Sequence, residues 1–113
     1  MEEKKFEKLY NEAIDEALSV LGPHIAKMIK FYINEKYSVR LSDTYNNPRA
    51  LTEALHSAID GASRVIQRRM LRILYGKIGI EPDFVMTENF ERKILDAKEI
   101  FEKKNNYSGS QPQ

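Results

Sequence analysis

The chain has 113 residues, 42% of them hydrophobic and 31% charged, and a formal net charge of +1. These values are typical of one globular domain rather than a disordered chain, and so small a net charge gives no general attraction to nucleic acid or membranes. The absence of cysteine excludes disulfides, thiolate metal sites and cysteine nucleophiles.

The N-terminal sequence MEEKKFEKLY is charged where a secretory signal needs an apolar run, and no segment has the apolar length of a membrane span. We therefore expect a cytoplasmic protein that does not enter a membrane, and the lack of cysteine agrees with a reducing compartment. The content of isoleucine, lysine and glutamate, without tryptophan or cysteine, is typical of a thermophilic source.

Two helices are predicted at the start of the chain. Apolar residues recur at steps of three and four from about Glu3 to Leu21, the spacing of one helical face. Gly22 and Pro23 should separate this helix from the next, because glycine accepts a positive φ angle and proline suits the first helical position. The second helix should run to about Lys36, with an apolar stripe formed by Ile25, Met28, Ile29, Tyr32 and Ile33.

The segment from Lys36 to Asn47 is predicted to be a loop, because serine, asparagine and aspartate residues that favour turns are concentrated in it. Leu41 is expected to attach this loop to the core. Tyr45 is expected to be the most exposed tyrosine, and so the one best placed to stack on a nucleic-acid base.

The stretch from Asn47 to Ile80 should form the central helical unit. Asn47 can cap the free backbone donors of a helix that begins at Pro48. At Asp60 and Gly61 two alternatives are open. Either two helices meet with little or no gap, which we favour because the apolar periodicity stays in phase, or one helix continues and another backbone passes close to Gly61.

The end of the central unit is predicted at Gly79, which suits the left-handed position after a helix, with Ile80 folding back onto Tyr75. The apolar connector that follows is expected to lie against the core, and it contains Phe84, Val85 and Met86.

A last helix is predicted from about Thr87, its N-cap, to Lys104. Four apolar residues on it step by four, three and four positions, and we call them the seam: Phe90, Ile94, Ala97 and Phe101. Such a narrow stripe suits pairing with another helix, so we expect the seam to form a homodimer. Residues 1–104 should then form one domain, and the polar residues 105–113 a disordered tail.

Basic residues without any acid occupy the chain between Gly61 and Ile80, namely Arg64, Arg68, Arg69, Arg72 and Lys77. On a helix, three of them share one face, which we call the arginine ridge: Arg64, Arg68 and Arg72, with Arg69 to one side. Such a ridge could follow the phosphates of a nucleic acid. The alternative is a solvated face, or pairing with the acidic residues Glu12, Asp15 and Glu16 of the first helix.

No residues form a recognisable catalytic, cofactor or metal motif. His24 and His56 have no helical neighbours that complete a metal site, and there is no glycine-rich phosphate loop, GxSxG turn or HExxH helix. The clustered carboxylates of the first helix lie on a polar face rather than in a setting that separates their pKa values. We therefore expect that the protein is not an enzyme and holds no cofactor.

The order of residues between Leu18 and Ile80 resembles that of a known family. It contains the aromatic pair Phe31-Tyr32, a helix exit at Lys36-Tyr37, an Asn-Pro helix opening, an interior glycine and the sequence Leu74-Tyr75-Gly76. This order is similar to the small archaeal all-helical family known as the Nitrosopumilus output domain type. The resemblance implies a regulatory or signal-output module with no established catalytic residue. The additional helices at both ends depart from that pattern and leave a stand-alone adaptor as an alternative.

From these observations we expect an all-α bundle of four to five amphipathic helices. The expected function is that of a non-catalytic regulatory or protein-interaction domain that self-associates. The alternative is a nucleic-acid-binding protein that uses the basic helix from Arg64 to Arg72.

Overall fold

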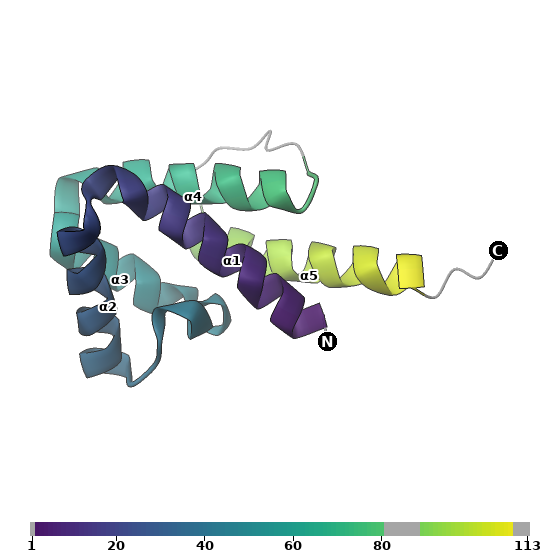
Figure 1. Cartoon of the computed structure of the whole chain (residues 1–113), viewed down its shortest axis with the longest axis horizontal. Coiled ribbons are helices and arrows are strands. Elements are labelled where there is room, and N and C mark those ends of the chain that lie inside the picture. Colours follow the sequence, from purple (N-terminus) through teal and green to yellow (C-terminus); the bar gives the residue numbers. More distant parts are fainter. Residues whose placement is uncertain (1, 81–88, 110–113) are drawn as a thin grey trace.

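The computed structural model describes residues 2–80 and 89–109, and within them the side chains of residues 5–80 and 89–104. This part is all helical, as predicted, and contains no strand. The helices and 3₁₀ turns are α1 (Glu2–Leu18), η1 (Ser19–Leu21), α2 (Pro23–Tyr37), η2 (Leu41–Asn46), α3 (Pro48–Ile59), η3 (Asp60–Ala62), α4 (Ser63–Lys77) and α5 (Phe90–Gly109). Helix α1 lies across α4 and α5, while α2 and α3 lie together at the end remote from the C-terminus (Figure 1).

An aromatic cluster holds α1, η2 and α5 together. The ring of Tyr45 lies 5.7 Å from the rings of both Phe6 and Tyr10, in edge-on arrangements that aromatic pairs favour, and Phe101 lies 5.9 Å from Phe6. The expectation that Tyr45 is exposed is therefore wrong, since only 3% of it is accessible. The predicted loop coils into the 3₁₀ turn η2, which rotates Tyr45 inward and also buries Leu41, as expected.

A buried hydrogen bond fixes η2 against α1. The hydroxyl group of Thr44 donates to the carbonyl oxygen of Leu41 at 2.7 Å, so its single proton is used within the turn. The hydroxyl group of Tyr10, 2.7 Å from Thr44 Oγ1, must then be the donor in the contact between these two residues. Both side chains are inaccessible to solvent, so the pair satisfies two polar groups that would be costly to leave unpaired.

The helix ends follow the predicted glycine and proline signals. Gly22 has a φ angle of +88°, and Pro23 begins α2. At the end of α4, Gly79 has a φ angle of +83°, and its amide donates to the carbonyl of Gly76. The amide of Ile80 donates to the carbonyl of Tyr75 at 2.9 Å, which completes the hydrogen-bond pattern of the Schellman motif.

The prediction that the Asn47 side chain caps α3 is wrong. Pro48 is the first residue of the helix, as expected, but the side chain of Asn47 makes no capping hydrogen bond. The Asn47 carbonyl accepts from the amide of Ala50 instead, so the backbone alone makes the transition from η2 to α3.

Helices α3 and α4 meet through the three residues of η3, which confirms two helices with almost no gap. The strained position is Asp60, with a φ angle of +29°, and not Gly61. A Cβ atom added at Gly61 would meet nothing within 4 Å, so no other backbone approaches it closely and that alternative is wrong.

The seam of α5 belongs to the core of the chain itself. Ile94 and Ala97 are inaccessible and Phe90 is 4% accessible, because α5 packs against α1, α3 and α4. Phe101 contacts the ring of Phe6. The prediction that these residues face a second copy is therefore wrong.

The limits of α5 also differ from the prediction. The helix begins at Phe90 and continues to Gly109 instead of ending at Lys104, so residues 105–109, expected in the tail, are helical. The predicted N-cap Thr87, the connector residues Phe84, Val85 and Met86, and residues 110–113 lie outside the described residues.

Removing either partner of the Tyr10–Thr44 hydrogen bond should destabilise the fold to different extents. Tyr10→Phe leaves Thr44 bonded to Leu41, and we expect a loss of about 1 kcal/mol in the free energy of unfolding. Thr44→Val leaves the buried Tyr10 hydroxyl without its acceptor, and the expected loss is about 2 kcal/mol. Urea unfolding followed by circular dichroism measures both, and an equal loss in the two variants would contradict the assigned donor.

Shortening a seam residue should affect folding and not assembly. Ile94→Ala removes a fully buried side chain from the core, and we expect the free energy of unfolding to fall by about 2–5 kcal/mol. Urea unfolding at two protein concentrations tests this directly. A destabilisation that vanishes on dilution would instead place Ile94 in an interface between copies.

Candidate functional site

The arginine ridge lies on the solvent face of α4. Arg64, Arg68 and Arg72 are all exposed, and so is Arg69. The buried face of the helix borders the ridge and contains Ile66, Gln67, Met70, Leu71, Leu74 and Tyr75. Because burial of this apolar face fixes the rotation of α4, the three ridge arginines are held pointing away from the core.

The ridge arginines differ from the other arginines of the chain in their partners. Elsewhere each arginine has a carboxylate close by: Arg40 is 3.3 Å from Asp43, Arg49 is 3.3 Å from Glu53, and Arg92 is 3.1 Å from Asp96. Among the side chains that the structure describes, those of residues 5–80 and 89–104, none of the ridge arginines forms an ion pair. Arg69 differs again, because its Nε donates to the backbone carbonyl of Glu16 at 3.4 Å.

The acidic residues of α1 that could have neutralised the ridge are bound by a lysine. Lys77 Nζ lies 2.9 Å from Glu16 Oε2 and 3.4 Å from Glu12 Oε1. The hydrogen bond to Glu16, followed by that to Glu12, raises the pKa of Lys77 above its usual value. Asp15 is exposed. The predicted pairing of these acids with arginine side chains is therefore wrong, and the ridge charge remains available.

Two further hydrogen bonds involve the buried side of α4, one to α5 and one within the helix itself. The hydroxyl group of Tyr75 donates to the carbonyl of Lys93 at 2.9 Å, which ties α4 to α5. Burial, and to a smaller extent the charge of Asp96, raises the pKa of Tyr75 to about 12. The buried amide group of Gln67 donates to the Ser63 hydroxyl at 2.9 Å.

The two histidines do not form a shared site. His24 is exposed on α2, and His56 is exposed on α3 with its Nδ1 atom 3.9 Å from Asp60. No group of three His, Asp or Glu side chains that could hold a metal ion occurs within the described part of the chain. His56 does line a hollow of about 400 Å³ beside the N-terminal end of the ridge, together with Arg64 and Arg92.

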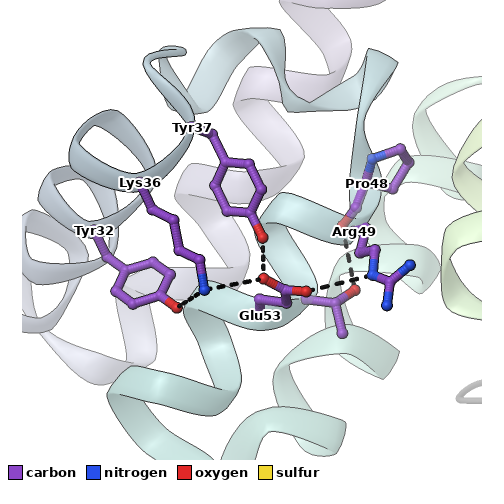
Figure 2. A network of polar contacts seen from close by, with 7 residues as sticks. Tyr32, Lys36, Tyr37, Pro48, Arg49 and Glu53 are labelled. Carbon is purple, nitrogen blue, oxygen red and sulfur yellow. Dashed lines mark hydrogen bonds and ion pairs between the residues drawn. The ribbon is translucent and has the colours of Figure 1, made fainter.

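Glu53 is the centre of a polar network that joins α2 to α3 (Figure 2). Its carboxylate accepts a hydrogen bond from the Tyr37 hydroxyl and lies 3.7 Å from Lys36 Nζ and 3.3 Å from Arg49 Nε. The Arg49–Glu53 spacing of four residues is visible in the sequence. The contacts with α2 span at least 16 residues of sequence, so sequence reasoning missed them.

The outer face of α2 exposes large apolar side chains. Phe31 is 68% accessible and Met28 is 44% accessible, whereas Ile29 and Ile33 on the other face are inaccessible. The assignment of Met28 to the buried stripe was therefore wrong, and Phe31 was missed as a surface residue. The signal for both was present, since α2 carries apolar residues in two different helical phases.

No family model, no curated protein and no solved structure matches the chain. The resemblance to the Nitrosopumilus output domain type therefore stays a prediction, as do an archaeal and a thermophilic source. Among the described residues, no helix is both long enough and apolar enough to cross a membrane.

The raised pKa of Tyr75 predicts a loss of stability at alkaline pH. Below pH 10, the ordinary pKa of tyrosine, Tyr75 is protonated in both the folded and the unfolded chain. Its contribution to the free energy of unfolding is therefore fully present there. Between pH 10 and about 12 the unfolded chain loses its proton first, and stability falls. Tyr75→Phe cannot ionise, so we expect it to be about 1 kcal/mol less stable at neutral pH but to lose stability less steeply above pH 10. Urea unfolding as a function of pH checks this, and parallel curves for the two proteins would contradict it.

Proposed function

We propose that this protein is a non-catalytic binding domain that binds nucleic acid through the arginine ridge. The observation that carries the proposal is the difference in pairing among the arginines. Those outside α4 each have a carboxylate within 3.3 Å, while Arg64, Arg68 and Arg72 have none among the described residues. Unpaired guanidinium groups on a rigid helix can bind phosphate without first breaking an internal ion pair.

The spacing of the ridge supports a repeated anionic ligand. Its members are four residues apart, which places successive Cα atoms about 6 Å apart along the helix axis. Each guanidinium can bind a phosphate in a bidentate manner, and the buried face of α4 keeps the three in register.

The composition of the ridge favours a nucleic acid over an acidic protein. Protein interfaces usually depend on buried aromatic or aliphatic anchors surrounded by polar groups. Val65, which is 60% accessible, is the only large exposed hydrophobic residue on α4. Such a surface supplies charge with little apolar area, which suits contacts to a phosphate backbone. A cytoplasmic location, expected from the sequence, forms part of this proposal.

The regulatory or protein-interaction role expected from the sequence is a second candidate. The seam no longer supports it, but the exposed Phe31 and Met28 of α2 do, because large accessible apolar side chains grouped on one helix are typical of contact surfaces.

Removing one ridge arginine should weaken nucleic-acid binding and its salt dependence. For Arg68→Ala we expect the slope of log K against log salt to decrease by about one, with a similar loss on all sequences, because the contact is to phosphate. Fluorescence anisotropy with labelled duplex and single-stranded DNA and RNA at several salt concentrations measures both quantities. The stability should change little, since Arg68 is exposed and makes no ion pair with a described residue.

Arg40→Ala is the matched control, because it removes an exposed arginine that is paired with Asp43 and lies away from α4, immediately before η2. We expect it to bind as the unmodified protein does. Absence of binding to every nucleic acid at low salt, or an equal effect of the two substitutions, would overturn the proposal.

A further inference from the structure

One face of helix α2 packs against the rest of the protein, and no described residue covers the opposite face. The inner face packs against α3 and the two neighbouring 3₁₀ turns, and it buries Ile29 and Ile33. At 100° per residue, Phe31 points almost directly away from these two isoleucines. It is 68% accessible, and a shallow apolar hollow of about 400 Å³ lies among Phe31, Met28 and Tyr32.

The charges beside Phe31 are arranged symmetrically. Lys27 precedes Phe31 by four residues and Glu35 follows it by four, so the three side chains form one row along the outer face. Both charged residues are exposed, and neither forms an ion pair with any residue that the structure describes. The row therefore has one cation, one aromatic ring and one anion at equal spacing.

We propose that α2 docks antiparallel against α2 of a second copy, with the two-fold axis beside Phe31. This symmetry places Lys27 of each copy opposite Glu35 of the other, so two equivalent ion pairs form. The two Phe31 rings meet at the axis, and Met28 of each copy packs beside Tyr32 of the other. The aromatic ring at the centre supplies the apolar contact and the charges at its ends set the register.

The charges on the outer face of α2 favour a second, antiparallel copy over a parallel copy or a membrane. A parallel pair of α2 helices would bring Lys27 against Lys27 and Glu35 against Glu35, which repel. An anionic membrane would repel Glu35, which lies on the same face as Phe31, and the exposed large apolar side chains of α2 number only two, Phe31 and Met28. A second copy provides an opposite charge for each end of the row.

The contact is small, which predicts a reversible dimer. Helix α2 has 15 residues and is about 22 Å long, so the helix pair buries less surface than a stable interface of standard size. We therefore expect monomers and dimers to exchange, with a dissociation constant in the micromolar to millimolar range. The surface shares no residue with the arginine ridge, so this inference is independent of nucleic-acid binding.

Sedimentation velocity on the full chain, from about 10 µM to about 1 mM, tests the dimer. Phe31→Ala should raise the dissociation constant by at least about tenfold, because it removes the central contact. Lys27→Glu and Glu35→Lys should each do the same, since each places like charges opposite one another. The double variant Lys27→Glu/Glu35→Lys restores both ion pairs with reversed polarity and should return the constant to within about threefold of the original.

Val65→Ala is the control, because it removes a similarly exposed apolar side chain from α4 and should leave the dissociation constant unchanged. Circular dichroism of each variant confirms that the fold is intact. A chain that stays monomeric at about 1 mM, or a double reversal that dissociates as readily as the single ones, would overturn the proposal. Binding of the monomer to anionic lipid vesicles, lost in Phe31→Ala without any self-association, would overturn it in favour of a membrane surface.

Discussion

The packing of Tyr45 against Phe6 and Tyr10 joins two parts of the chain that are distant in sequence. It holds η2 against α1, and η2 leads directly into α3, so the position of α3 depends on this contact. Phe101 extends the same cluster to α5. The hydrogen bond from Tyr10 to Thr44 gives the cluster a directional component, since apolar packing alone would tolerate small rotations of the 3₁₀ turn.

The placement of α1 against α4 determines which charges are left on the surface. Lys77, at the end of α4, forms ion pairs with Glu12 and Glu16 on α1. The sequence pattern had suggested arginines as the partners of these carboxylates. The ridge is therefore unpaired as a consequence of packing: the rotation of α4 that buries Leu71 and Leu74 also aims Arg64, Arg68 and Arg72 away from α1. A rotation by one residue would change both the core and the charge pattern.

Helix α2 has more apolar surface than the core of the protein covers. It carries apolar residues in two phases, and only one phase is needed to cover α3 and the adjoining turns. The network centred on Glu53 fixes which phase is turned inward, because Tyr37 and Lys36 must face α3 to reach its carboxylate (Figure 2). The other phase, with Phe31 and Met28, is then presented to solvent. The two surfaces that we propose for binding, on α2 and α4, thus both follow from how helices are oriented in the bundle.

Local sequence patterns were enough to predict the helical class and most helix ends. The signals at Gly22-Pro23, Pro48 and Gly79 act within a few residues, through fixed φ angles and local hydrogen bonds, so no distant contact could override them. Three features follow from packing between distant segments: the seam of α5 lies in the core, Tyr45 is buried, and Lys77 forms ion pairs with the acidic residues of α1. The spacing of an apolar or charged stripe is the same whether the stripe faces a neighbouring helix, a second copy of the chain or solvent. The choice among them depends on contacts between residues far apart in the chain, which local patterns do not contain.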